Sequence, residues 1–72
     1  MQIYQRIRDM REDADKTQRE VADDLGMWLT TYRNYENGER VPPFDVMIKI
    51  ALYYNVSLDY LAGLKNTPTK LK

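Results

Sequence analysis

Glycine, proline and polar residues that favour turns divide the chain into five short segments, and this division most constrains what it can fold into. Glycine occurs only at positions 26, 38 and 63, and proline only at 42, 43 and 68. Between these residues apolar side chains recur every three or four positions, which is the spacing of one face of an α-helix. No two segments alternate in the manner of paired β-strands. The sequence therefore predicts an all-α fold of five short helices.

Each expected helix is bounded by residue types that start or stop helices. Thr17 and Glu20 have the spacing of a capping box, in which the threonine hydroxyl and the glutamate carboxylate satisfy free amides of the first turn. Prolines suit a helix start, and glycine or asparagine suits a helix end. The helices are expected between Gln2 and Asp13, Thr17 and Gly26, Trp28 and Glu36, Pro42 and Asn55, and Ser57 and Gly63.

A chain of 72 residues lies near the lower size limit for a free-standing core. It contains neither cysteine nor histidine, so neither a disulfide nor a zinc site can reinforce it. Helix packing, or a second copy of the chain, must supply the stability. We expect one domain over 1–64 and a basic, flexible tail over 65–72. The expected core consists of Ile3, Ile7, Met10, Val21, Ala22, Leu25, Tyr32, Tyr35, Phe44, Met47, Ile50, Ala51, Leu58 and Leu61.

The composition argues against several classes of protein. Histidine and cysteine, the commonest general base and a strong nucleophile, are absent, and Ser57 is the single serine. We therefore expect no enzyme, no cofactor and no metal site. No apolar run could span a bilayer, and the first residues do not form a signal peptide. These features favour a cytoplasmic protein without membrane contact.

The charge balance is unusual for a nucleic-acid-binding protein. Eleven basic residues are matched by eleven acidic ones, and the stretch 1–64 carries eight basic against eleven acidic residues. Proteins that bind nucleic acid usually have a basic excess or a basic face. Net charge alone therefore does not favour DNA as the partner, and the argument for DNA depends on the motif.

Two neighbouring segments, together covering about 17–36, have the pattern of a helix-turn-helix. Val21, Leu25, Met27, Tyr32 and Tyr35 are apolar at the spacings that bury the inner faces of two crossing helices.

The chain resembles the lambda-repressor-like helix-turn-helix family, of the Xre and Cro/cI type. Four blocks match in order over about residues 2–64, namely 7–12 (IRDMRE), 17–27 (TQREVADDLGM), 31–42 (TYRNYENGERVP), and 47–51 with 56–61 (MIKIA, VSLDYL). The resemblance implies a compact five-helix bundle that binds double-stranded DNA with its third helix in the major groove.

The resemblance also implies roles for individual residues. The outward positions of the third helix would read base edges, where arginine suits guanine, asparagine suits adenine and a methyl group suits thymine. These are Leu29, Thr30, Arg33 and Asn34. Phosphate contacts, which position the protein without specifying sequence, are expected from Gln18, Trp28, Asn37 and Arg40. Trp28 stands where the family usually has a serine or threonine that caps the third helix.

Two further expectations concern the scaffold and the assembly. In the family, the positions of Arg11 and Glu36 pair across the first and third helices, so we expect an ion pair there. A homodimer on a roughly palindromic operator would place two reading helices in successive major grooves about 34 Å apart. Its interface is expected near Tyr53, Tyr60 and Leu64.

Two classes of function fit this sequence. The first is a DNA-binding transcriptional regulator of phage or plasmid type, with repression the expected direction, and Gln18, Arg33, Asn34, Asn37 and Arg40 favour it. The second is a protein-interaction module on the same fold, an antitoxin-like or adaptor protein that uses an apolar surface at Trp28 and Leu29. The neutral charge and the acidic pair Asp23-Asp24 favour the second. The fold alone does not decide between them.

Overall fold

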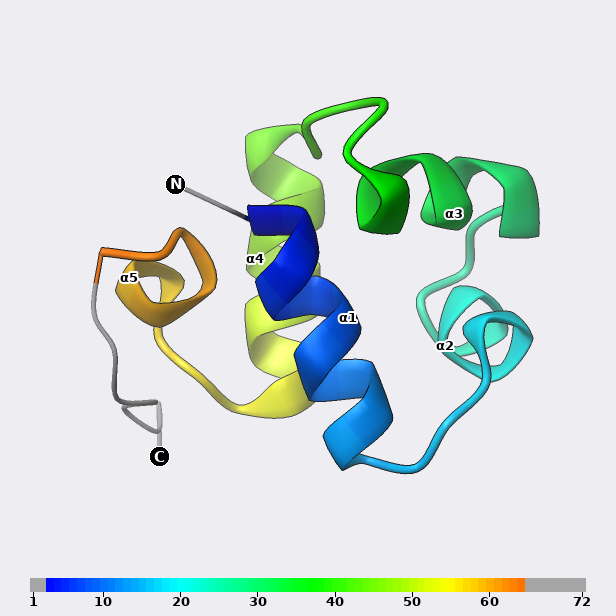
Figure 1. Cartoon of the computed structure of the whole chain (residues 1–72), viewed down its shortest axis with the longest axis horizontal. Helices are drawn as coiled ribbons and strands as arrows, with labels where there is room; N and C mark the ends of the chain where they lie inside the picture. Colours follow the sequence, from blue (N-terminus) through cyan, green and yellow to red (C-terminus); the bar gives the residue numbers. More distant parts are fainter. Residues whose placement is uncertain (1–2, 65–72) are drawn as a thin grey trace.

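The structure is a computed structural model that describes residues 3–64, with side chains from residue 5 onward. Over this range it contains five α-helices and no strand, as the sequence predicts. The helices are α1 (Ile3–Asp13), α2 (Gln18–Asp24), α3 (Leu29–Asn37), α4 (Phe44–Tyr54) and α5 (Leu58–Leu61). In Figure 1, α1 crosses in front of α4, with α2 and α3 on one side and α5 on the other. The expected basic tail, 65–72, lies outside the described residues.

Two of the helix starts are capped as the sequence predicts. The Thr17 hydroxyl accepts a hydrogen bond from the Glu20 amide at 3.1 Å, and the Glu20 carboxylate accepts one from the Thr17 amide at 3.0 Å. The Ser57 hydroxyl accepts from the Tyr60 amide at 3.1 Å and caps α5. Pro43 is the residue before α4, so the helix itself begins at Phe44, slightly later than expected. These local bonds fix where α2 and α5 begin, independently of tertiary packing.

Each of the five helices ends in a residue with a positive φ, in a paired hydrogen-bond pattern that satisfies its last carbonyls. Gly26 has φ 70° and Gly38 has φ 80°, a region that glycine occupies without steric cost. Asn55 has φ 56°, which confirms it as the stop for α4. At the end of α1 this position belongs to Asp15, with φ 57°. Its amide donates to the Glu12 carbonyl, and the Lys16 amide donates to the Arg11 carbonyl.

Replacing Asp15 with glycine should stabilise the domain by up to about 1 kcal/mol, because a side chain in the left-handed region is strained and glycine is not. The matched control is Glu12→Gly, inside α1, where glycine should cost about 1 kcal/mol instead. Urea unfolding of the three proteins measures both changes. An Asp15→Gly variant less stable than the parent would show that the left-handed turn is not strained.

The core lies where α1, α3, α4 and α5 meet, with α2 closing it beside α3. Ten of the expected core residues are buried, and Met47 and Leu58 are half-buried and pack against them. Val56 is also buried, although the sequence did not single it out. The side chain of Ile3 lies outside the described ones. The buried apolar residues are Ile7, Met10, Val21, Ala22, Leu25, Tyr32, Tyr35, Ile50, Ala51, Val56 and Leu61.

Phe44 was expected in the core, and this expectation is wrong, because its side chain is 69% exposed. The two buried residues of α4 are Ile50 and Ala51. Phe44 lies seven residues before Ala51 and within about 20° of it around the helix axis, so its spacing is that of the inward face. It stands in the first turn, however, where its side chain is left exposed. Spacing alone placed Phe44 on the stripe, but its position at the helix end leaves it in solvent.

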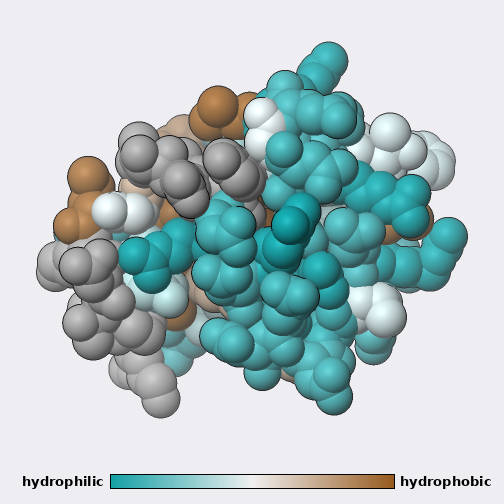
Figure 2. Space-filling view, viewed as in Figure 1, coloured by the Kyte–Doolittle hydropathy of each residue, from teal (hydrophilic) through white to brown (hydrophobic). Residues whose placement is uncertain are grey.

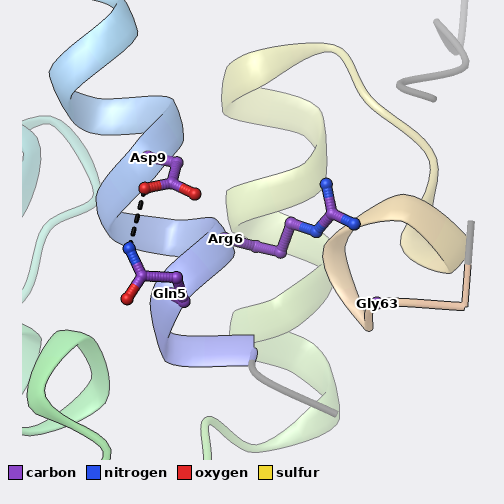
Figure 3. A pocket seen from close by; sticks show the side chains of 4 residues that line it. All are labelled: Gln5, Arg6, Asp9 and Gly63. Carbon is purple, nitrogen blue, oxygen red and sulfur yellow. Dashed lines mark hydrogen bonds between the residues drawn. The ribbon is translucent and has the colours of Figure 1, made fainter. Parts of the chain in front are cut away.

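A contact between α1 and α5 holds the short last helix in place. The Arg6 guanidinium lies 4.2 Å from the centre of the Tyr60 ring, a cation–π contact. Figure 3 shows Arg6 extending from α1 toward the turn at Gly63, and beside it Gln5 donates a hydrogen bond to Asp9 at 2.8 Å. These residues line a shallow polar pocket between α1 and the end of α5. Gln5 and Asp9 are bonded to each other and Arg6 lies over the Tyr60 ring, so these side chains serve the scaffold.

Candidate nucleic-acid interface

Helices α2 and α3 are joined by the turn at Leu25–Trp28 and pack against each other, while α3 also packs against α1. Val21, Ala22 and Leu25 are buried on the inner side of α2, and Tyr32 and Tyr35 on the inner side of α3. This arrangement is a helix-turn-helix over 17–36, as the sequence predicts. Because two of its faces are occupied by α1 and α2, α3 presents its remaining face to solvent.

Two of the four expected base-reading residues are exposed in the structure, and the other two are half-buried. Thr30 and Arg33 are exposed on the outer face of α3. Asn34 is half-buried. Leu29 is also half-buried and packs partly against the core, so only part of its side chain is available to a ligand. The outer face of α3 is therefore a mixed polar and apolar surface with one cationic side chain at its centre.

The expected ion pair between Arg11 and Glu36 is present and forms two parallel hydrogen bonds. Arg11 Nη2 lies 2.9 Å from Glu36 Oε1, and Arg11 Nε lies 2.9 Å from Glu36 Oε2. The Glu36 side chain is fully buried, and that of Arg11 is 16% exposed. Arg11 also donates to the Lys16 carbonyl at 2.8 Å, which ties the pair to the start of α2. The pair thus joins α1, α2 and α3 at one point beneath the outer face of α3.

Burial would raise the pKa of the Glu36 carboxyl, but hydrogen bonds from Arg11 and Gln18 outweigh it and hold the pKa below its ordinary value. Glu36 is therefore ionised at neutral pH. Burial raises the pKa of the neighbouring phenols Tyr32 and Tyr54, the latter to about 12. Glu36 is thus the buried charged residue of the part of the chain that the structure describes, and Arg11 is its main counter-ion.

Gln18 lies between this buried pair and the outer face of α3. Its amide nitrogen donates to Glu36 Oε1 at 3.2 Å, and its amide oxygen accepts from Arg33 Nε at 3.1 Å. Gln18 is half-buried. The side chain therefore braces α2 against α3, and both ends of its amide are engaged.

Arg8 is a member of this cluster that the sequence reasoning missed. Its Nε lies 3.6 Å from Glu36 Oε1, and its Nη2 donates to the Asn37 side chain at 3.4 Å. Arg8 stands three residues before Arg11 on the same side of α1, a spacing from which its proximity to Glu36 could have been inferred. Asn37 and Arg40, two of the expected phosphate contacts, are both exposed at the end of α3.

Trp28 is the residue before α3, and it leaves the helix start uncapped. Its side chain makes no capping hydrogen bond, because an indole N–H can only donate. The side chain is 83% exposed. Trp28 therefore does not anchor the turn by burial, and the first amides of α3 remain accessible beside it.

Replacing Trp28 with serine should stabilise the domain by about 0.5–2 kcal/mol, because a serine hydroxyl can accept from a free amide of the first turn. Little burial is lost, since the indole is mostly exposed. Trp28→Ala, which removes the ring without adding a cap, is the matched control and should stay near the parent. Thermal unfolding of the three proteins decides the point. Equal stability of the serine and alanine variants would mean that the added hydroxyl forms no cap.

The expected dimer residues differ in their surroundings. Tyr53 is half-buried, and its hydroxyl donates to Asp24, which also accepts from Lys16 at 3.4 Å. Tyr60 is half-buried beneath Arg6. Leu64 is 72% exposed.

Other large apolar side chains are exposed as well, including Val41, Phe44 and Leu52. Figure 2 shows apolar residues gathered at the upper and left edges of a face that is otherwise hydrophilic. Among the described residues no cluster of metal-ligating side chains occurs. None of the described helices is long and apolar enough to cross a membrane.

The fold and the paired helices define a helix-turn-helix domain. Comparison with known families agrees, because the profile of the helix-turn-helix family matches residues 7–61. The chain belongs to this family.

Curated proteins similar to the chain carry names of transcriptional regulators. The transcriptional repressor RstR of a cryptic phage CTXphi, from Vibrio cholerae, is 40% identical over 63 residues, covering 88% of this chain and 56% of RstR. The regulator ImmR of Bacillus subtilis is 38% identical over 63 residues, covering 88% of this chain and 50% of ImmR. The chain thus spans about half the length of these relatives. No solved structure matches it significantly.

Proposed function

We propose that this protein is a transcriptional regulator, acting as a repressor, that binds double-stranded DNA in a sequence-specific manner. The observation that carries the proposal is the helix-turn-helix itself, with Arg33 and Thr30 on the free face of α3 and a braced ion pair beneath them. The similarity to proteins named as phage and bacterial regulators supports it. Such a protein has no catalytic role and acts in the cytoplasm, on the nucleoid.

In this proposal α3 lies in the major groove and its outer residues meet base edges. Arg33 and Asn34 are suited to guanine and adenine, and Leu29 and Thr30 offer methyl groups to thymine. Trp28 and Gln18 lie at the near ends of α3 and α2, and Asn37 and Arg40 lie beyond the far end of α3. These four residues would flank the groove and contact phosphates, which sets the register without reading sequence.

The acidic surplus of the domain does not oppose this arrangement, because affinity for DNA depends on which charges are exposed on the face that contacts it. Glu36 is buried against Arg11 and approached by Arg8. Asp24 accepts from Lys16 and from the Tyr53 hydroxyl. The exposed cations Arg33 and Arg40 lie on or beside α3, so the face proposed to meet DNA carries positive charge, and Arg40 is available for a phosphate.

The test is a salt titration of binding to duplex DNA of random sequence. Cations that displace counterions from phosphates give a linear fall of log affinity with log salt, with a slope of about −0.9 per phosphate neutralised. We expect a slope of about −2 or steeper. Affinity that is absent, or that does not change with salt, would contradict DNA binding.

The second candidate, a protein-interaction module, is favoured by one observation, the 83% exposure of Trp28. Exposed tryptophans are frequent among residues that dominate protein interfaces. In that case binding of a protein partner would be lost in Trp28→Ser, while Arg33→Ala and Asn34→Ala would remain near neutral. The DNA proposal predicts the reverse order for DNA affinity.

We further propose that the protein binds a roughly palindromic operator as a homodimer. Leu64 is exposed and Tyr60 is half-buried at the α5 end of the molecule, where a second copy could cover them. Analytical ultracentrifugation of the chain, alone and with a two-half-site duplex, measures the stoichiometry. Two chains per duplex are expected, and a single chain on the full operator would contradict the dimer.

A further inference from the structure

Three polar side chains form a continuous line of hydrogen bonds from the buried core to the outer face of α3. Glu36 is held by Arg11 and is fully buried. Gln18 donates to Glu36 Oε1 at 3.2 Å, and Arg33 donates to the oxygen of Gln18 at 3.1 Å. Gln18 is the first residue of α2, whereas Arg33 and Glu36 lie one turn apart on α3. We call this line of Glu36, Gln18 and Arg33 the relay.

The chemistry of the two ends gives the relay a fixed direction. An ionised carboxylate only accepts hydrogen bonds, so Gln18 must turn its amide nitrogen toward Glu36. A guanidinium only donates, so the same amide must turn its oxygen toward Arg33. One orientation of the amide satisfies both partners, and the flipped orientation satisfies neither. The Gln18 amide is therefore held in one orientation. Glu36, which fixes that orientation, cannot move without breaking its buried ion pair with Arg11.

This anchoring restricts Arg33, which would otherwise be a long, exposed side chain with many rotamers. Arg33 Nε is bound to Gln18, and no described residue bonds to the two η nitrogens at the far end of the guanidinium. A planar pair of donors at that end matches the two acceptors O6 and N7 of guanine in the major groove.

We propose that Gln18 is a positioning residue that sets Arg33 to read guanine through its two η nitrogens. The proposal rests on the DNA-binding function proposed above and makes it more specific. It assigns the preference at one base pair to a residue on α2 that itself contacts no base. The structural basis is the juxtaposition of Glu36, Gln18 and Arg33 across α2 and α3.

The phosphate contact proposed above for Gln18 is compatible with positioning, but its loss would have a different consequence. The amide keeps one N–H beyond the bond to Glu36, and a phosphate oxygen could accept it. Loss of a phosphate contact weakens binding to all sequences alike. Loss of a positioning contact instead removes the preference at the single base pair that Arg33 reads.

The test is selection of bound duplexes from a fully randomised DNA library, followed by sequencing. The proteins are the parent chain, Gln18→Ala, Arg33→Ala and the double variant. Arg19→Ala is the matched control, because it removes an exposed cation one residue from Gln18 and outside the relay. Far-ultraviolet circular dichroism checks the fold of each protein. If Gln18→Ala is unfolded, Gln18→Met replaces it, since methionine keeps the length of the side chain and neither hydrogen bond.

We expect the parent to select guanine at a defined position and Arg33→Ala to lose that preference by about 5- to 150-fold. Gln18→Ala should lose part of the preference at the same position and keep the rest of the site. The double variant should have the same base preference as Arg33→Ala alone, because the two residues act on that preference as one unit. The Arg19→Ala control should keep the whole preference.

Two results would overturn the inference, and they differ in what they say of the function. If Gln18→Ala keeps the guanine preference, or if the two single effects add in the double variant, positioning is wrong while DNA binding stands. If the parent selects no sequence at all, both the inference and the proposed sequence-specific function fail.

Discussion

Replacing Glu36 with alanine should lower the free energy of unfolding by about 3 kcal/mol or more, because it leaves the largely buried guanidinium of Arg11 without its partner. Such a loss is a large part of the total stability of a domain of this size. The measurement is urea unfolding followed by circular dichroism. Glu39→Ala, which removes an exposed carboxylate just after α3, is the control and should stay within about 0.5 kcal/mol of the parent. Equal midpoints for the two variants would contradict a structural role for the pair.

The same ion pair predicts how stability depends on pH. The pKa of Glu36 is lower in the folded state than its ordinary value of 4.5, so the folded state favours the ionised form. The stabilisation is fully present above about pH 4.5 and is lost as the pH falls through the folded value. Glu36→Gln should remove this part of the acid dependence. Glu20 and Asp24, whose pKa values are also lowered, should leave a smaller acid dependence in the variant.

Replacing Arg33 or Asn34 with alanine should each reduce discrimination against the wrong base by about 1–3 kcal/mol, or about 5- to 150-fold in relative affinity. The physical reason is that a bidentate contact to a base edge is specific for that base. Each variant should lose its preference at a different base pair. Competition binding with single-base variants of the selected duplex measures the effect.

The matched control for these two variants is Arg40→Ala, at an exposed position beyond the end of α3. If Arg40 contacts a phosphate, its loss should weaken binding to all duplexes alike and reduce the magnitude of the salt slope by about one. Specific binding that is unchanged in both Arg33→Ala and Asn34→Ala would mean that other residues read the sequence.

The helix boundaries could be predicted from the sequence because their causes are local. The capping box of Thr17 and Glu20, the serine cap at Ser57 and the left-handed stop at Asn55 each depend on a few consecutive residues. The ion pair between Arg11 and Glu36 is not local, and the resemblance to a known family predicted it. No spacing rule within one helix could have paired residues on α1 and α3.

The remaining features depend on how the helices meet. The bond between Gln18 and Arg33 requires the crossing of α2 and α3 to be known, and neither helix reveals it alone. Phe44 has the correct spacing for a core residue, yet it stands at a helix end where its side chain is left exposed. Leu29 was expected to face DNA, and its side chain packs partly against the core. Periodicity predicts which side chains share a face, whereas packing decides how much of that face is covered.

The most direct test of sequence-specific binding is the ratio of two dissociation constants for the parent chain. One is measured for the duplex selected from the randomised library, and the other for a scrambled duplex of the same length and composition at the same salt concentration. We expect the selected duplex to bind on the order of 10³-fold more tightly, as is typical of specific over non-specific complexes. A ratio near one would contradict the account, because α3 would then contact DNA without reading it.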